Sequence, residues 1–279
     1  MPPLTQTHYT PRTLSWGKDS RARWAVQPSG VAVVFVHGFG GGATDTWDEF
    51  ADLLPERKEC AGHDLLFYGY DSLTVQAPNS AALVRDFLHA LATEPFQAVM
   101  SRSLRVDRGL DATFRYRRIV IVAHSLGAVV AREALIQAAD KPSMRSWIPL
   151  VRLALFAPAH SGALITELAE EAIGAVKLSW LKLARTSYKA YAQVLVDLER
   201  GSPTLRRLET RTAALIAEGL DTLRAAVVVQ GDRDRVVYAA VFGSDPGPHV
   251  EPGKGHADVC KPSSNYPQPL EHVLPLMTP

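Results

Sequence analysis

Short apolar runs alternate with longer amphipathic segments along this chain, and this alternation constrains the fold most strongly. The runs are β-branched or aromatic and too short for independent helices, so they predict strands. The clearest are Val31–Val36, Leu65–Tyr68, Ile119–Val122, Val151–Phe156 and Ala225–Val229. Helices are expected between them at Trp47–Leu54, Ser80–Ala92 and Leu126–Ala139. Strands that are apolar throughout are typical of buried parallel sheets. The pattern therefore predicts an α/β fold, a mainly parallel sheet flanked by helices.

Two segments depart from the alternation. The N-terminal residues to about Ser29 are expected to form a strand or hairpin at the sheet edge. Residues 163–223 are far more than one crossover helix needs, so they predict a helical insertion between the sixth and seventh strands, acting as a cap or pocket wall. Within it, a helix should begin with Ser202 as N-cap and Pro203 at its first position, and end near Gly219. Without linkers or repeats, residues 1–279 are interpreted as one domain.

Composition excludes several classes of protein. Thirty Lys and Arg against 29 Asp and Glu give a net charge of +1, which offers no global basic surface for nucleic acid or an anionic membrane. The sequence has neither a signal-peptide pattern nor an apolar stretch of transmembrane length. Two cysteines, Cys60 and Cys260, cannot form a disulfide framework and favour a reducing compartment. We therefore expect a cytoplasmic protein with no nucleic-acid partner and no stable membrane insertion.

A serine lies between a strand and a helix in residues 119–135 (IVIVAHSLGAVVAREAL). The strand should end near Ala123 and the helix should start at Leu126, which leaves Ser125 at the apex of a tight turn. Such a turn strains its apex residue and presents the side chain at the end of the sheet. The residues two before and two after must be small because the backbones crowd there, and Ala123 and Gly127 meet this need. The pattern is G-x-S-x-G with Ala in place of the first Gly.

A glycine-rich turn follows the first predicted strand, at residues 37–42 (HGFGGG). Glycines let backbone N–H groups point at a developing oxyanion without obstruction. The same residues also fit the dinucleotide-binding pattern G-x-G-x-x-A, with Asp71 as a candidate ribose-binding acid. We disfavour this alternative because it leaves the serine turn and the C-terminal motifs unexplained. A phosphate-binding loop is excluded because its lysine is absent.

Two segments near the C-terminus add an acid and a base. Residues 227–237 (VVVQGDRDRVV) carry Asp232 and Asp234 on a loop after a strand, and residues 253–256 (GKGH) present His256 on a flexible loop. Serine, then aspartate, then histidine is the chain order of the α/β-hydrolase triad. The four motifs occur in the order that this triad requires.

The chain resembles the α/β-hydrolases, and among them the lipase-like serine esterases related to the GPI inositol-deacylase branch. The matching pieces are VVFVHGFGG, LLFYGYDS, RIVIVAHSLGAVVAREAL, LALFAPAHSG, VQGDRDRVV and GKGHADVCKP, from residue 31 to about 262. The resemblance implies that Ser125 is the nucleophile, His256 the base and Asp234 the acid. It also implies oxyanion donors at the Phe39 and Leu126 amides. Gly40, His124 and His160 are candidate substrate-binding residues beside these motifs.

The expected activity is hydrolysis of a carboxylic ester through an acyl-enzyme. The substrate would be a small-molecule or lipid-like acyl ester, although amide and thioester cleavage can use the same site. No cofactor is expected, and the absence of H-E-x-x-H and C-x-x-C argues against a metal site. The alternative from another class is a non-catalytic interaction or signalling protein with this fold, which has no need for all three triad residues. The oligomeric state does not follow from the sequence.

Other residues have simpler interpretations. His37 and His124 are expected to support loop hydrogen bonds, Asp232 to brace its loop, and Cys260 to be a buried small residue. The arginines before the serine strand are expected on a solvated surface at the N-terminal edge of the sheet; they are Arg102, Arg105, Arg108, Arg115, Arg117 and Arg118. Apolar residues of the insertion are expected to cover the sheet and part of a ligand; they are Leu164, Leu168, Ile173, Leu178, Trp180 and Leu181.

Overall fold

Eight strands form one sheet in the computed structural model, which describes residues 9–175 and 193–278, except for the side chains of 97 and 171–175. Across the sheet they are β1 (Tyr9–Thr13), β2 (Arg21–Ala25), β4 (Asp64–Tyr68), β3 (Val31–Val36), β5 (Arg118–His124), β6 (Val151–Phe156), β7 (Ala225–Gly231) and β8 (His249–Glu251). β4, β3, β5, β6, β7 and β8 pair parallel in that order, whereas β2 pairs antiparallel with β4 and β1 pairs antiparallel with β2 at one edge. The predicted α/β fold and its edge hairpin are confirmed.

The strands that lead to the motifs are the most deeply buried. Every residue of β3 and β4 is buried, as expected for strands covered on both faces. β3 and β6 have the predicted bounds. β5 continues two residues beyond the predicted end, to His124, so the turn at Ser125 follows the strand immediately.

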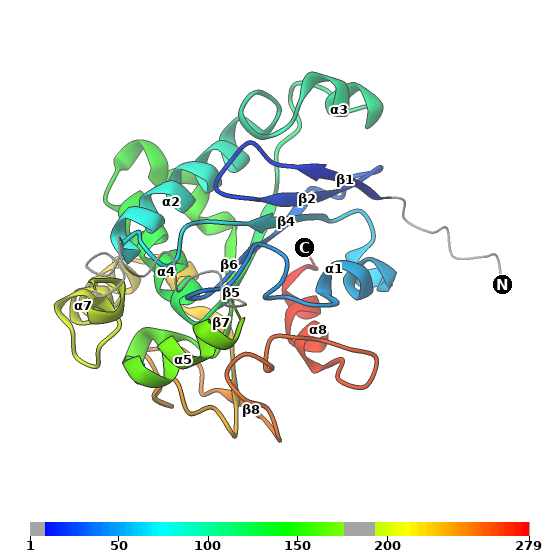
Figure 1. The fold of residues 1–279 in the computed structure, drawn as a ribbon. Coiled ribbons are helices and arrows are strands. Elements are labelled where there is room, and N and C mark those ends of the chain that lie inside the picture. Colours follow the sequence, from blue (N-terminus) through cyan, green and yellow to red (C-terminus); the bar gives the residue numbers. More distant parts are fainter. Residues whose placement is uncertain (1–8, 176–192, 279) are drawn as a thin grey trace.

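Helices cover both faces of the sheet (Figure 1). α2 (Ala77–Thr93), α4 (Leu126–Ala139) and α7 (Pro203–Ala217) lie on one face, and α1 (Phe50–Leu53) and α8 (Gln268–Val273) lie on the other. α3 (Arg102–Asp107) precedes β5, and α5 (Ile165–Ala175) follows β6. α1 is shorter than the predicted Trp47–Leu54. α4 has the predicted bounds but is buried on nearly all sides, with Gln137 its one residue that is not, because it packs against α2 and α7 as well as the sheet.

Arg108 corrects the expectation of a solvated arginine cluster. Its side chain is buried, and its Nη2 donates to both carboxylate oxygens of Asp64 at 2.8 Å. Its Nε donates to the Ala25 carbonyl at 2.8 Å, and the guanidinium lies over the Trp24 ring. Asp64 is the first residue of β4 and is fully buried, so its charge requires a partner inside the protein. Arg102, Arg115 and Arg117 are exposed, as predicted, and Arg105 and Arg118 are partly exposed.

The chain between β6 and β7 contains α5 and α7. α7 begins as predicted, with Pro203 at its first position and the Ser202 hydroxyl accepting from the Leu205 amide at 3.2 Å. Leu168 is buried, whereas Leu164 is exposed. The Ile173 side chain and the predicted apolar residues Leu178, Trp180 and Leu181 lie outside the described residues. In the described parts of the chain, no helix has the length and apolar character needed to cross a membrane.

Candidate active site

Ser125 occupies a strained turn between β5 and α4. Its φ of 54° and ψ of −122° lie in a region that residues with a side chain rarely adopt. Close backbone contacts hold the turn: a Cβ on Gly127 would lie 2.2 Å from the Val36 carbonyl oxygen, and one on Gly38 would lie 2.8 Å from the Ser125 Cβ. The crowding inferred from the sequence thus requires glycine at 127, while the Ala123 methyl fits in the core.

His256 links this serine to an acid on a third loop. Its Nε2 lies 2.9 Å from the Ser125 Oγ, and its Nδ1 lies 2.9 Å from the Asp234 Oδ2. The side chains of His256 and Asp234 are 4% and 3% exposed, so bulk water scarcely competes for these hydrogen bonds. An ionised carboxylate only accepts hydrogen bonds, which places the imidazole proton on Nδ1 and leaves the Nε2 lone pair facing the serine hydroxyl.

The environment of Asp234 favours its ionised form. Burial by itself would raise the pKa of this carboxyl, but the hydrogen bond and charge interaction with His256 outweigh burial and hold the pKa below its usual value. Its Oδ1 also accepts from the amides of Val236 and Val237, at 2.8 and 3.2 Å. These bonds fix the carboxylate in the orientation that reaches His256.

Asp232, the other acid of this loop, is exposed and bonds elsewhere. Its Oδ1 accepts from the Gly253 amide at 2.7 Å, and its own amide donates to the Glu251 carbonyl at 3.1 Å. The Arg233 amide donates to the Lys254 carbonyl at 3.0 Å. These bonds join the aspartate loop to the histidine loop, so Asp232 connects the two loops that carry Asp234 and His256.

The glycine-rich turn after β3 lies beside the serine. The Gly40 amide donates to the Ser72 hydroxyl at 3.1 Å, and Phe39 is buried at the pocket wall. Leu126 is the first residue of α4, so its amide has no acceptor within the helix and lies at the positive end of the helix dipole. A positive helix end directly after Ser125 can stabilise negative charge that develops at the serine.

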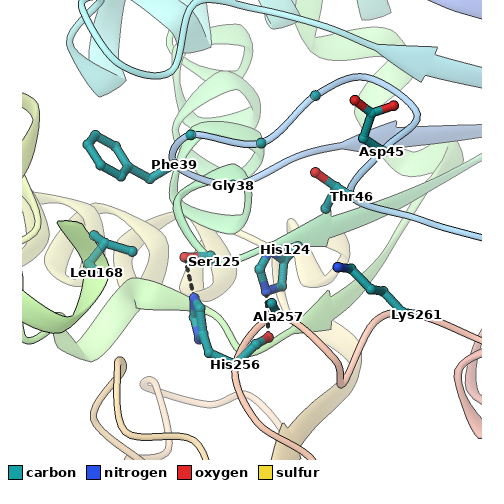
Figure 2. A pocket seen from close by; sticks show the side chains of 13 residues that line it. Gly38, Phe39, Asp45, Thr46, His124, Ser125, Leu168, His256, Ala257 and Lys261 are labelled. Atoms are coloured by element: carbon teal, nitrogen blue, oxygen red, sulfur yellow. Dashed lines mark hydrogen bonds between the residues drawn. The ribbon is translucent and has the colours of Figure 1, made fainter. Parts of the chain in front are cut away.

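A pocket of about 470 Å³ opens over these groups. Its lining includes the predicted residues Ser125, His256, Phe39, Gly40 and His124, together with Leu168 of α5. Figure 2 shows Phe39 and Leu168 on one side of Ser125, and Asp45, Thr46 and Lys261 on the other. The pocket therefore has an apolar end and a polar end, with the serine between them.

Buried histidines surround the serine and are held neutral. The His124 Nε2–H donates to the His256 carbonyl at 2.9 Å. The His37 Nδ1–H donates to the Gly38 carbonyl at 2.9 Å, and the His37 Nε2 accepts from the Tyr70 amide at 3.3 Å. Burial lowers the pKa of His37 to about 4, and burial with the nearby charge of His256 lowers the pKa of His124 to about 3. Both support loops, as the sequence suggested.

His160 does not line the pocket, although it was a candidate substrate-binding residue. It is buried, and its ring packs against Phe242 with ring centroids 4.5 Å apart. Burial and the nearby charge of Arg132 hold its pKa well below the usual value. Asp71, the acid of the dinucleotide alternative, is bonded within its own turn to Leu73 and Thr74.

Sequence reasoning missed the polar end of the pocket. Asp45 and Thr46 lie just beyond the glycine run, and Lys261 lies five positions after His256, so proximity to a motif was their only sequence indication. In the part of the chain that is described, no group of three or more His, Cys, Asp or Glu side chains is arranged to hold a metal ion.

The sequence matches the alpha/beta hydrolase family over residues 33–264, and the chain belongs to this family. The mature lipase BlEst2 of Bacillus licheniformis has a similar structure, with a TM-score of 0.51, 14% identity and 98% of both chains covered. The peroxisomal alpha-beta-hydrolase Lpx1 of Saccharomyces cerevisiae gives a TM-score of 0.51 and 12% identity, with 99% of this chain and 91% of that chain covered. At such identities the similarity shows the fold alone. No curated protein matches the sequence.

Proposed function

We propose that this alpha/beta hydrolase is a serine esterase that cleaves carboxylic esters through a covalent acyl-enzyme. The observation that carries the proposal is the chain of two 2.9 Å hydrogen bonds from Ser125 through His256 to Asp234. A nucleophile, a base and an acid that orients the base are the three parts that acyl transfer requires. The strained turn under Ser125 supports the same role, since strain of this kind clusters at functional sites.

In the acylation step, the Ser125 Oγ attacks the carbonyl carbon of the ester while its proton moves to the His256 Nε2. The carbonyl oxygen becomes an oxyanion, which the amides of Phe39 and Leu126 stabilise; one such donor is typically worth about 3 kcal/mol. Asp234 stabilises the imidazolium through Nδ1–H. The C–O bond to the alcohol then breaks, and the departing oxygen takes the proton from Nε2.

Deacylation repeats these steps with water. The His256 Nε2 removes a proton from a water molecule, whose oxygen attacks the acyl carbon. The second oxyanion collapses, the bond to the Ser125 Oγ breaks, and Oγ recovers the proton from His256. A carboxylic acid leaves, and the protein returns to its starting state without any cofactor.

An acyl substrate with an apolar chain is supported by the apolar end of the pocket, where Phe39 and Leu168 can cover that chain. The lipase BlEst2 has the same fold. The GPI inositol-deacylase branch, suggested by the motifs, stays a prediction. Amide and thioester cleavage remain within reach of the same groups.

Covalent labelling tests the proposal. A fluorophosphonate probe should label the wild-type protein at Ser125, because phosphonylation needs a serine activated by its base. Ser125→Ala should not be labelled, and Asp232→Asn should be labelled like the wild type, since Asp232 does not contact His256. Absence of labelling in the wild type would favour the non-catalytic binding protein of the same fold. Labelling of Ser125→Ala would place the nucleophile elsewhere.

A further inference from the structure

Lys261 is a cation in the wall of the pocket for which the proposed mechanism has no use. It is partly buried, and it lines the same pocket as Ser125, His124 and His256. Figure 2 shows its ammonium directed toward His124. Among the residues that the structure describes, no carboxylate forms an ion pair with it. A cation that has lost part of its hydration without gaining a partner is unfavourable, so its position points to a ligand charge.

The backbone around Lys261 is firmly held. Its neighbours Cys260 and Pro262 are buried, and its own amide donates to the Asp258 carbonyl at 3.1 Å. The Cys260 thiol donates to the Thr46 carbonyl at 3.5 Å, which joins the loop of Lys261 to the segment that follows the glycine-rich turn. Only the side chain of Lys261 therefore needs to be ordered when a ligand binds, which reduces the entropic cost of binding.

The mechanism assigns the two ends of the pocket to the two halves of an ester. His256 returns its proton to the departing alcohol, so the alcohol half must lie on the side of the histidine loop. Lys261 belongs to that loop, five positions beyond His256. The acyl half then lies toward Phe39 and Leu168, at the apolar end.

We propose that Lys261 binds an anionic group, a carboxylate or a phosphate, on the alcohol half of the substrate. This inference rests on the proposed esterase function and specifies its substrate class: an uncharged acyl chain joined to an alcohol that carries negative charge. Lys261 sets specificity, while the bond-breaking steps belong to Ser125 and His256. A lysine suits either anion because its ammonium acts as a point charge without a fixed geometry.

Asp45 lines the same end of the pocket and carries the opposite charge. It is exposed, and its Oδ1 accepts from the Thr44 hydroxyl at 3.2 Å. Its carboxylate repels an anionic ligand while Lys261 attracts one. Substitutions at the two positions should therefore change the preference for anionic esters in opposite directions. Because Asp45 is exposed, water and salt screen it more than they screen Lys261.

The experiment compares 4-acetoxybenzoate with its methyl ester, and 4-acetoxyphenyl phosphate with 4-acetoxyanisole, by kcat/KM. Each pair has the same acetyl group and differs in the charge of the alcohol half. The ratio of anionic to neutral ester should fall about tenfold in Lys261→Met, as expected for loss of a charge-assisted contact. Lys261→Arg keeps the charge and should retain most of the ratio, while Asp45→Asn should raise it a few-fold.

The controls distinguish a failure of this inference from a failure of the proposed esterase function. Lys141→Met removes an exposed cation just beyond α4 and should leave the ratio unchanged, which excludes an effect of net charge. 4-Nitrophenyl hydrogen succinate against 4-nitrophenyl butyrate places the charge on the acyl half, and this ratio should not depend on Lys261. An unchanged alcohol-side ratio in Lys261→Met, with the neutral esters still hydrolysed, overturns the role of Lys261 alone. A wild-type protein that hydrolyses none of these esters overturns the proposed function and this inference together.

Discussion

Two buried aspartates lie at opposite ends of the parallel strands and differ in the residue that each carboxylate contacts. The side of the sheet where these strands begin is here called the amino edge, and the side where they end the carboxyl edge. Asp64 begins β4 at the amino edge, and its oxygens accept from Arg108, from the Tyr116 hydroxyl at 2.5 Å and from the Ala25 amide at 2.9 Å. Asp234 follows β7 at the carboxyl edge and accepts from His256 and two backbone amides. Both carboxylates are enclosed, yet only the chain of bonds from Asp234 ends at a pocket.

The difference lies in whether the partner can change its charge. An arginine stays protonated in proteins, so the Asp64 cluster has one state and can serve only the fold. A histidine ring can accept a proton and give it back during a reaction, so the Asp234 cluster can carry out proton transfer. Substitutions at the carboxyl edge should therefore change activity, and substitutions at the amino edge should change stability.

The largest effect is expected at the serine. Ser125→Ala removes the attacking oxygen, so kcat for 4-nitrophenyl acetate should fall by up to about a millionfold. The thermal midpoint should stay close to that of the wild type, because Ala is smaller and, among the described residues, His256 is the one hydrogen-bond partner of the buried Ser125 hydroxyl. Retained hydrolysis with a normal melting curve would refute the assignment of the nucleophile.

The aspartate loop offers a matched pair. Asp234→Asn should lower kcat about 10⁴-fold, because an amide cannot hold the imidazole tautomer or stabilise the imidazolium. Asp232→Asn should change kcat far less, since its side chain bonds the Gly253 amide instead of His256. Steady-state kinetics of the two variants, with circular dichroism as a check on folding, decide the question. A larger loss in Asp232→Asn would mean that the roles of the two acids are reversed.

At the amino edge, removal of the partner of a buried aspartate should lower the free energy of unfolding. Arg108→Met leaves Asp64 buried without its cation and should lower the free energy of unfolding by about 3–5 kcal/mol. The exposed Arg102 provides the control, and Arg102→Met should stay within about 0.5 kcal/mol. Urea denaturation measures both. Well below its unfolding transition, Arg108→Met should keep the wild-type kcat. A specific loss of activity without loss of stability would contradict the distinction between the two edges.

Acid should lower the stability of the protein through the buried histidines at the carboxyl edge. The pKa of His37 is lowered to about 4 and that of His124 to about 3, below the value of about 6.5 for an unfolded chain. Because the unfolded state binds these protons first, the stability that the neutral rings contribute is fully present above pH ~6.5. It is lost as the pH falls toward about 4 for His37 and about 3 for His124. At pH ~5 each imidazole should account for about 2 kcal/mol of lost stability. Imidazole NMR titration tests this: titration of either ring near pH ~6.5 would contradict it.

The parts that the sequence predicted well are those set by local pattern. The bounds of β3, β6 and α4 follow from where apolar runs end. The motif order gave a serine, an aspartate and a histidine, and the family resemblance implied Asp234 as the acid; the structure brings Ser125, Asp234 and His256 together. What these three residues do chemically stays a prediction.

Contacts between distant segments were not predictable. Arg108 and Asp64 are 44 positions apart, and nothing in either segment indicates the other. The direction of a loop side chain is equally inaccessible, because it depends on how the loop packs. For this reason His160 was a candidate for a pocket that it does not line, and Lys261 was missed.

The smallest expected effect concerns the length of the acyl chain. It tests the pocket at the carboxyl edge, in contrast to the enclosed Asp64 cluster at the amino edge. One fully buried methylene contributes about 0.8 kcal/mol, so kcat/KM can rise about fourfold per carbon at most while the chain still fits beside Phe39 and Leu168. Glu167 of α5 is partly exposed and Glu170 is exposed, which suits a solvated surface more than a lid that docks on lipid. We therefore expect preference for short to medium acyl chains and no interfacial activation. A series of 4-nitrophenyl esters, measured below and above the critical micelle concentration, checks this. A rate that rises sharply only above that concentration, with preference for long chains, would show that the pocket serves a lipid surface.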